Sequence, residues 1–105
     1  MKMLQAMIRP EKENNVINAL ENEGIYAMTK WDVVGRGQQH GIQVGSMHYD
    51  ELPKVMLMLV IEDDQITKAL AAIKEGAVTG NYGDGKIFVS PVSNTYTVRT
   101  GRMLN

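Results

Sequence analysis

The sequence contains no cysteine. This absence excludes a disulfide framework, a thiolate metal site and a cysteine nucleophile, and it is compatible with a reducing cytoplasm. Long apolar runs are also missing. No stretch approaches the ~20 residues that a helix needs to span a bilayer, and the opening segment MKMLQAMIRPEKE does not follow the pattern of a signal peptide. We therefore expect a soluble, unprocessed protein of the cytoplasm.

An excess of charge of either sign is absent as well. The chain has 11 basic and 12 acidic residues, for a net charge of −1. Binding to nucleic acid or to an anionic membrane surface needs a positive field, so we expect neither partner. At 105 residues the chain makes one domain, residues 1–105, with room for a two-layer core. An oligomer interface would add useful burial to a domain of this size.

Glycine is plentiful, and three glycines fall in the segment TGNYGDGKIFV, residues 79–89. One interpretation is a hairpin turn, because Asp84-Gly85 is a strong hairpin signal. The other is a phosphate cradle, in which small residues expose consecutive backbone N–H groups and Lys86 adds a positive charge. The segment is not a Walker A loop, since Gly83 is an extra glycine and Ile87 follows the lysine where Ser or Thr is required. The residues of this segment alone leave both interpretations open.

The first half of the chain predicts a strand, a helix and a second strand. Residues 2–9 form the first strand, and Pro10 suits the first helical position because its missing N–H is not needed there. The helix should end near Glu23, with Gly24 placed to terminate it. The second strand is expected over about residues 25–34. A long loop without sustained periodicity follows, over residues 35–53.

The second half repeats this order. Residues 54–61, KVMLMLVI, predict a buried central strand, and Asp63 or Asp64 should cap a second helix. Its buried face comprises Ile66, Ala69, Leu70, Ile73 and Ala77. Strands across residues 87–98 complete the pattern. Two strand–helix–strand units predict an α+β protein, a ferredoxin-like βαββαβ sandwich with both helices on one sheet face. A flavodoxin-like fold would need more helices.

The long central loop has features of a binding segment. Loops above ~12–15 residues without secondary structure of their own are usually functional or disordered. Its spacing GRGQQHG is one residue too long for a dinucleotide fingerprint and opens no helix, so a Rossmann site is rejected. Apolar residues that could contact a partner are Ile42, Met47, Tyr49 and Leu52.

Taken in order, five blocks of the sequence resemble the PII signal-transduction proteins across nearly the whole chain. The opening MKMLQAMIRPEK is similar to the family's first strand and helix entry, and GRGQQHG and LPK resemble the base and exit of its T-loop. TGNYGDGKIFV resembles the B-loop and VRTG the C-terminal loop. The resemblance implies a T-loop over about 36–53, a B-loop over about 79–86 and a C-terminal loop over about 97–105. It also implies a trimer that binds ATP or ADP between subunits and senses 2-oxoglutarate through Mg-ATP.

The resemblance carries particular roles to particular positions. The nucleotide-binding residues that it implies are Thr29, Gly35, Arg36, Gly37, Gln38, Val60, Gly83, Asp84, Gly85, Lys86 and Arg99. Gln39 would help to ligate Mg²⁺, and Gln39, Gly41 and Lys54 would bind 2-oxoglutarate. A lysine suits that role because a point charge can hold a carboxylate in a cleft shielded from water. The B-loop is thereby assigned to the phosphates, which favours the cradle over the hairpin.

Three departures from the family pattern stand out. Gln38 replaces an arginine that many members carry, with Arg36 two positions earlier, and Thr97 replaces a second C-terminal arginine. The T-loop is short by several residues and lacks the family's uridylylation tyrosine, for which Tyr49 is not a counterpart. A short loop reading GIQVGSMHYDELPK resembles the nitrogenase-associated subgroup of PII proteins, specifically the first of its two paired paralogues.

The resemblance therefore predicts a non-enzymatic sensor that regulates nitrogenase by contact with the dinitrogenase component, together with the paired paralogue. A second hypothesis is a PII regulator of glutamine synthetase or of an ammonium channel. A third is a small ferredoxin-like phosphotransferase, in which Asp84 is the acidic candidate within the phosphate loop.

Other chemistry-bearing residues favour structural interpretations. His40 and His48 have no nearby carboxylate pair and make a poor metal site. Met56 and Met58 are expected as core filler. Trp31 should pack against its own sheet or a neighbouring subunit.

Overall fold

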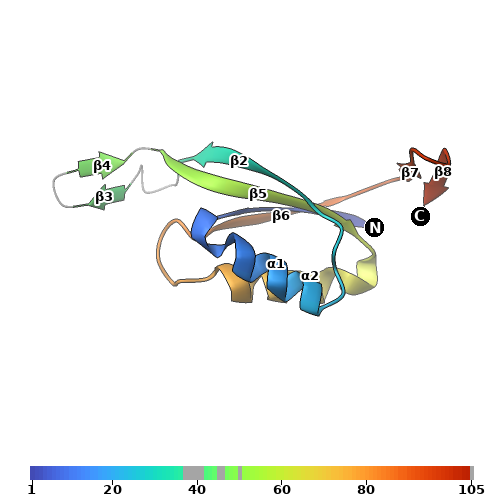
Figure 1. Cartoon of the computed structure of the whole chain (residues 1–105), viewed down its shortest axis with the longest axis horizontal. Coiled ribbons are helices and arrows are strands. Elements are labelled where there is room, and N and C mark those ends of the chain that lie inside the picture. Colours follow the sequence, from blue (N-terminus) through green and yellow to red (C-terminus); the bar gives the residue numbers. More distant parts are fainter. Residues whose placement is uncertain (37–41, 45–46, 50, 105) are drawn as a thin grey trace.

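Four antiparallel strands form one sheet in the computed structural model, which describes residues 1–36, 42–44, 47–49 and 51–104. The strand order is β2-β5-β1-β6, and two helices lie against one face of the sheet (Figure 1). These elements are β1 (Lys2–Ile8), α1 (Glu13–Asn22), β2 (Thr29–Gly35), β5 (Leu52–Ile61), α2 (Ile66–Ala77) and β6 (Gly85–Pro91). The α+β class and the ferredoxin-like order of elements are confirmed.

Short turns of 3₁₀ helix precede both α-helices. Pro10 opens the turn η1 (Pro10–Lys12), which leads into α1, and Gly24 follows the end of α1 with φ +79. A positive φ is cheap only for glycine, so Gly24 reverses the chain as predicted. The second strand begins later than predicted, at Thr29 instead of residue 25. Ile25 is buried against the core but forms no strand pair, which explains why its apolar character misled the prediction.

The predicted cap of the second helix is wrong. The turn η2 (Asp63–Gln65) starts after Glu62, and neither Glu62 nor Gln65, the residue before α2, makes a side-chain capping bond. Asp63 lies inside η2, where its carboxylate accepts a hydrogen bond of 2.8 Å from the Met1 ammonium instead. The Asp63 carboxylate therefore pairs with the Met1 ammonium and does not make the predicted cap on the backbone amides of the helix.

The core lies between the sheet and the helices. Leu4, Leu57 and Leu59 from the strands and Val16 and Leu20 from α1 are at most 2% exposed. Among the predicted residues of α2, Ala69, Ile73 and Ala77 are buried, whereas Ile66 and Leu70 are half-buried against the core.

The two helices come closest at a glycine. A Cβ atom added to Gly76 would lie 2.8 Å from the Cα of Val16 and 2.9 Å from its backbone nitrogen. Alanine is the better helix former by about 1 kcal/mol, so only this close approach explains a glycine inside α2. The spacing of the helical layer therefore depends on Gly76.

No helix of the described residues lies on the opposite face of the sheet. The register of β2, β5, β1 and β6 brings to this face Trp31, Met56, Met7, Met3 and Phe88, among others. Trp31 is 40% and Phe88 51% exposed. Met56 and Met58 are half-buried on this face, so the prediction that they fill the core is not met within the single chain. The position of β5 at the centre of the sheet is confirmed, but only one of its faces is buried.

The central loop has secondary structure of its own, contrary to the prediction. It carries a two-stranded ribbon of β3 (Ile42–Val44) and β4 (Met47–Tyr49) that extends beyond the sheet (Figure 1). The apolar residues alternate with polar ones around Gly45-Ser46 in the sequence, and this is a hairpin pattern that the prediction overlooked. The strand β5 also starts earlier than predicted, at Leu52 instead of residue 54.

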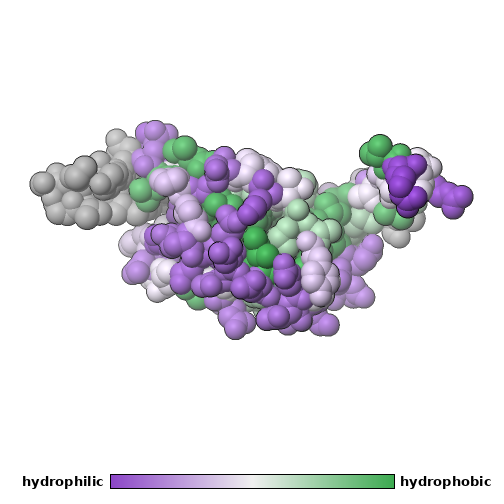
Figure 2. All heavy atoms as spheres, in the orientation of Figure 1, coloured by the Kyte–Doolittle hydropathy of each residue, from purple (hydrophilic) through white to green (hydrophobic). Residues whose placement is uncertain are grey.

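A second ribbon, of β7 (Thr95–Thr97) and β8 (Arg102–Leu104), lies at the other end of the molecule (Figure 1). The chain measures 55 × 24 × 20 Å along its principal axes. Figure 2 shows hydrophilic side chains over the solvent side of the helices and both apolar and hydrophilic ones on this ribbon. Its exposed apolar side chains are Tyr96, Val98, Met103 and Leu104. In the described part of the chain, no helix is long and apolar enough to cross a membrane.

Candidate functional site

The segment singled out in the sequence, residues 79–86, connects α2 to β6. It therefore joins a helix to a strand, and the interpretation as a β-hairpin turn is wrong. Gly80, Gly83 and Gly85 all have positive φ, at +89, +96 and +108. Such angles are readily available only to glycine, which accounts for the three glycines within six positions.

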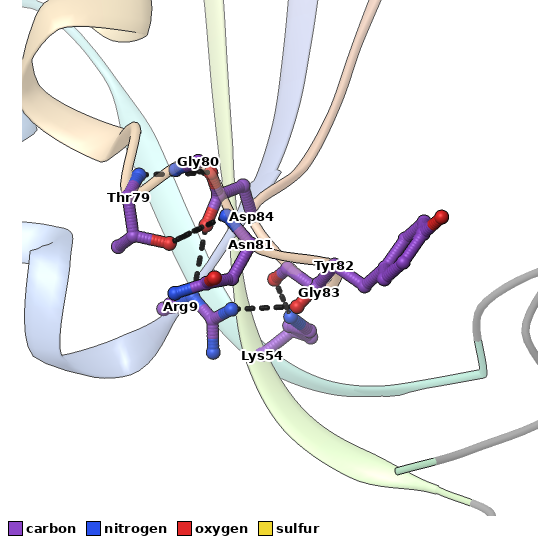
Figure 3. A network of polar contacts seen from close by, with 8 residues as sticks. All are labelled: Arg9, Lys54, Thr79, Gly80, Asn81, Tyr82, Gly83 and Asp84. Atoms are coloured by element: carbon purple, nitrogen blue, oxygen red, sulfur yellow. Dashed lines mark hydrogen bonds and ion pairs between the residues drawn. The ribbon is translucent and has the colours of Figure 1, made fainter.

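The Asp84 carboxylate holds this loop together from inside (Figure 3). It accepts hydrogen bonds from the backbone N–H groups of Thr79, at 2.8 Å, and Gly80, at 2.9 Å. It also accepts the Thr79 hydroxyl and, at 3.1 Å, the Nε of Arg9. The bonds from Thr79 lower the pKa of the Asp84 carboxyl well below its usual range, and Gly80 and Arg9 contribute further in the same direction. A carboxylate with this many donors is a poor general base.

Two cations hold the carbonyl groups of the same loop. The Nη2 of Arg9, the residue after β1, donates to the carbonyl oxygen of Tyr82 at 2.7 Å. The Nζ of Lys54, near the start of β5, donates to the carbonyl oxygen of Gly83. Figure 3 shows both side chains approaching the loop from the same side, while the Tyr82 ring points away.

Lys54 is the one polar or charged residue that is buried within the described part of the chain, at 7% exposure. Burial, followed by the neighbouring Arg9 guanidinium, lowers the pKa of its ammonium below the ordinary value. The nearby Glu11 and Asp84 carboxylates oppose this shift of the pKa. Within the described residues, the ammonium donates one hydrogen bond, to the neutral Gly83 carbonyl, and forms no ion pair, so its charge is incompletely compensated. The position is therefore suited to receiving a carboxylate.

Replacing Asp84 with asparagine should cost roughly 2 kcal/mol of unfolding free energy at neutral pH, because charge-assisted hydrogen bonds are lost. The folded pKa of Asp84 is depressed, so its contribution is complete above the unfolded value of 3.8 and is lost as the pH falls toward the folded value. Urea unfolding of parent and variant should therefore converge below pH 3.8. An equal change at the exposed Asp32 should have little effect. If the difference in unfolding free energy between the parent and Asp84→Asn stayed constant on acidification, this role of Asp84 would be contradicted.

Comparison with known proteins decides what kind of molecule carries this loop. The family model for "Nitrogen regulatory protein P-II" matches residues 1–102. This chain belongs to the PII family. It is 55% identical over 100 residues to "Nitrogen fixation nifHD region glnB-like protein 1" of Methanococcus maripaludis, with 95% of each chain covered. It is 51% identical over 102 residues to "Nitrogen fixation nifHD1 region GlnB-like protein 1" of Methanosarcina barkeri, with 97% of each covered. "Nitrogen regulatory protein P-II 1" of Methanothermobacter thermautotrophicus is 47% identical over 105 residues, 96% of this chain and 91% of that one.

PII proteins are regulators of nitrogen metabolism and not enzymes, so the phosphotransferase hypothesis is set aside. The geometry of Asp84 agrees with this assignment. Its carboxylate binds three groups of its own loop and Arg9, and therefore serves the structure of the PII B-loop.

Several positions implied by the PII resemblance gather at one end of the sheet. Gly35 ends β2 beside Lys54, since a Cβ added there would lie 3.3 Å from Lys54 Cγ. Arg36 follows and is exposed. Lys86 pairs with Met7 in β1, one position after the Gly85–Ile8 pair. The residues of this near group are Gly35, Arg36, Lys54, Gly83, Asp84, Gly85 and Lys86.

Three other positions lie away from that end. Val55 and Gly85 both pair with Ile8, whereas Val60 pairs with Met3. Val60 is therefore five residues, or roughly 17 Å, further along the sheet. Thr29 is at the start of β2, whose other end holds Gly35. Arg99 lies between β7 and β8, on the ribbon at the far end of the molecule (Figure 1).

The positions Gly37, Gln38, Gln39 and Gly41 fall outside the described residues, and with them the predicted ligand of Mg²⁺. Sequence reasoning missed Arg9 and Thr79, which donate three of the four hydrogen bonds to the Asp84 carboxylate. Arg9 offered no signal of its own, because its partners Tyr82 and Asp84 follow 73 and 75 residues later in the chain.

Proposed function

We propose that this PII protein is a cytoplasmic, homotrimeric sensor that binds ATP or ADP between subunits and 2-oxoglutarate through Mg-ATP. In this proposal it regulates nitrogenase by direct contact of its T-loop with the dinitrogenase component, in company with a paired PII paralogue.

The observation that carries the nucleotide site is the separation of its predicted residues into two groups. The B-loop lies at one end of the sheet, and Thr29, Val60 and Arg99 lie away from it. One chain cannot surround one nucleotide with both groups, whereas two neighbouring copies can. The B-loop of one copy would bind the phosphates through backbone amides and Lys86, and the neighbour would supply Arg99.

Exposed apolar surface supports assembly. The helix-free face of the sheet presents Trp31 and Phe88, each at least 40% exposed. An isolated two-stranded hairpin is marginal in water, yet the β7–β8 ribbon carries Val98 at 97% exposure. Neighbouring copies that cover both surfaces would bury this apolar area, which is the usual driving force of association.

Lys54 supports the site for the oxoacid. Its buried ammonium lies between the T-loop exit and the B-loop, and among the described residues its hydrogen-bond partner is the Gly83 carbonyl. A carboxylate of 2-oxoglutarate would compensate this charge better than a neutral carbonyl does. The predicted partners Gln39 and Gly41 would complete the site, and Gln39 would join Mg²⁺ to the nucleotide.

The T-loop ribbon supports contact with a protein partner. Its register pairs Ile42 with Tyr49 and Val44 with Met47. Two pairs of apolar residues therefore alternate along the ribbon with the polar Gln43–His48 pair. Leu52 continues this segment into β5. An apolar ribbon of this kind suits a protein surface, and the relatives named for the nifHD region favour nitrogenase over glutamine synthetase or an ammonium channel.

A nitrogenase assay with Lys54→Gln tests the function. The parent, mixed with its paralogue, should inhibit purified nitrogenase, and 2-oxoglutarate with Mg-ATP should relieve the inhibition. Lys54→Gln should still inhibit, because glutamine can donate to Gly83, but relief should require at least about tenfold more 2-oxoglutarate since the charge pair is lost. Calorimetry should show oxoacid binding to the parent only with Mg-ATP present.

The control variant is Lys68→Gln, which removes an exposed lysine from α2 and should behave as the parent. If the parent protein leaves nitrogenase fully active, nitrogenase is not its target. Capture of glutamine synthetase or an ammonium channel by the parent would instead favour the second PII hypothesis. Oxoacid binding that is equally tight without Mg-ATP would sink the sensing mechanism.

A further inference from the structure

Two successive peptide groups of the B-loop have their carbonyls turned toward cations. The Arg9 guanidinium donates a hydrogen bond to the Tyr82 carbonyl, and the Lys54 ammonium donates one to the Gly83 carbonyl. A Cβ added to Gly83 would lie 3.2 Å from Arg9 Nη2 and 3.5 Å from Lys54 Nζ, so the two cations flank this residue closely. The orientation of both peptide planes is therefore set by side chains from β1 and β5.

The direction of the carbonyls determines that of the amides. No peptide bond in the described structure is cis, and in a trans peptide the C=O and the following N–H point opposite ways. The N–H of Gly83 must then point away from Arg9, and the N–H of Asp84 away from Lys54. Within the described residues, neither N–H donates a hydrogen bond. Two adjacent, outward-facing amides form an anion-binding nest.

We infer that Arg9 is a positioning residue for the nucleotide phosphates: it holds the B-loop so that the Gly83 and Asp84 amides face the anion. This inference deepens the proposed function and rests on it for the identity of the ligand. Arg9 itself stays on the inner side of the loop, bound to Tyr82 and Asp84, and does not touch the phosphates.

Arg9 carries more of this role than Lys54 does. Its guanidinium spans two loop residues, with Nε on the Asp84 carboxylate and Nη2 on the Tyr82 carbonyl. In the described part of the chain Lys54 donates to one carbonyl, that of Gly83, and it is the residue that an incoming oxoacid would engage. When Lys54 turns to the oxoacid, the contacts of Arg9 keep the loop in place. The nest thus persists through the change that the sensor is proposed to detect.

The test compares Arg9→Lys with Lys12→Gln. A lysine keeps the charge of Arg9 but cannot bridge two acceptors with a planar fork. ADP affinity, measured by calorimetry, should fall by about tenfold or more in Arg9→Lys, because misaligned donors lose most of their benefit. Lys12→Gln removes a neighbouring cation whose side chain makes no hydrogen bond or ion pair with residues 79–86 in the described structure, and its ADP affinity should stay within about twofold of the parent.

Amide spectra separate positioning from general stability. ADP or inorganic tripolyphosphate should shift the Gly83 and Asp84 N–H resonances of the parent strongly and those of Arg9→Lys weakly. If tripolyphosphate gives this difference while adenine nucleotides bind neither protein, the positioning role stands and the proposed ligand is wrong. If the parent binds ADP and Arg9→Lys binds it equally well, or if the two resonances of the parent do not move, the inference is overturned.

Discussion

Gly85→Ala should destabilise the fold of this protein severely. The new Cβ would lie 1.7 Å from the carbonyl oxygen of Met7 and 2.8 Å from its carbonyl carbon, and both are backbone atoms that no side-chain rotation can move away. Gly85 also has φ +108, which a side chain strongly disfavours. This overlap can be relieved only if β6 separates from β1 at the Ile8–Gly85 pair. The expected cost exceeds about 4 kcal/mol, out of the roughly 5–15 kcal/mol that stabilises a domain.

Urea unfolding followed by circular dichroism measures this effect, and Gly80→Ala is the matched control. Gly80 also has a positive φ, +89, but a Cβ added there meets nothing within 4 Å. Its substitution should cost only the backbone strain, about 1–3 kcal/mol. The comparison isolates the collision with Met7 from the strain. Equal midpoints for the two variants would show that β1 and β6 are not in the close contact described.

Lys86→Ala and Arg99→Ala should each abolish high-affinity ATP binding, yet a mixture of the two should recover it. In the proposed trimer, each change would remove one cation from every cleft when all copies are identical. In a mixed trimer, the intact Lys86 of one copy would meet the intact Arg99 of its neighbour, which would restore one complete cleft in each closed ring. Affinity in the separate variants should fall by about 2–3 kcal/mol, the value of a charge-assisted contact to an anion.

The experiment is performed by denaturing the two variants together, refolding them and titrating with ATP. The control mixes Lys86→Ala with a chain that carries both changes, because no pairing in that mixture reunites the two cations. Binding that returns in the first mixture but not in the second supports a shared cleft. Recovery in neither mixture, or normal binding by Arg99→Ala alone, would contradict the assignment of Arg99 to its neighbour's phosphates.

The order of elements was predictable because it depends on local patterns. Pro10 before a helix, Gly24 after it and the apolar run of β5 are read from consecutive residues. The T-loop ribbon could also have been recognised from its alternation around Gly45-Ser46. The exposure of the outer face of β5 within the single chain could not have been predicted. A run such as KVMLMLVI indicates apolar surroundings on both faces, and it contains nothing to tell whether a helix of the same chain or another copy provides them.

The candidate site was predictable in part. The three glycines of the B-loop are explained by their positive φ angles, and a run of glycines predicts such angles from the sequence alone. The role of Asp84 was not visible, since a carboxylate in a glycine-rich loop can point to solvent, to a ligand or inward. Its inward direction is decided by Arg9 and Thr79. The helix start at Asp63 failed for a similar reason, because the Met1 ammonium competes for the carboxylate.

Gly76 has a mechanical consequence for signalling. With the backbone of α2 seated directly on Val16 of α1, either helix can slide past the other only by forcing main-chain atoms into collision. Packed layers of this kind change between discrete arrangements and do not deform gradually. We therefore expect the helical layer to keep its arrangement if effectors bind, so that any conformational response would be confined to the loops at the edge of the sheet.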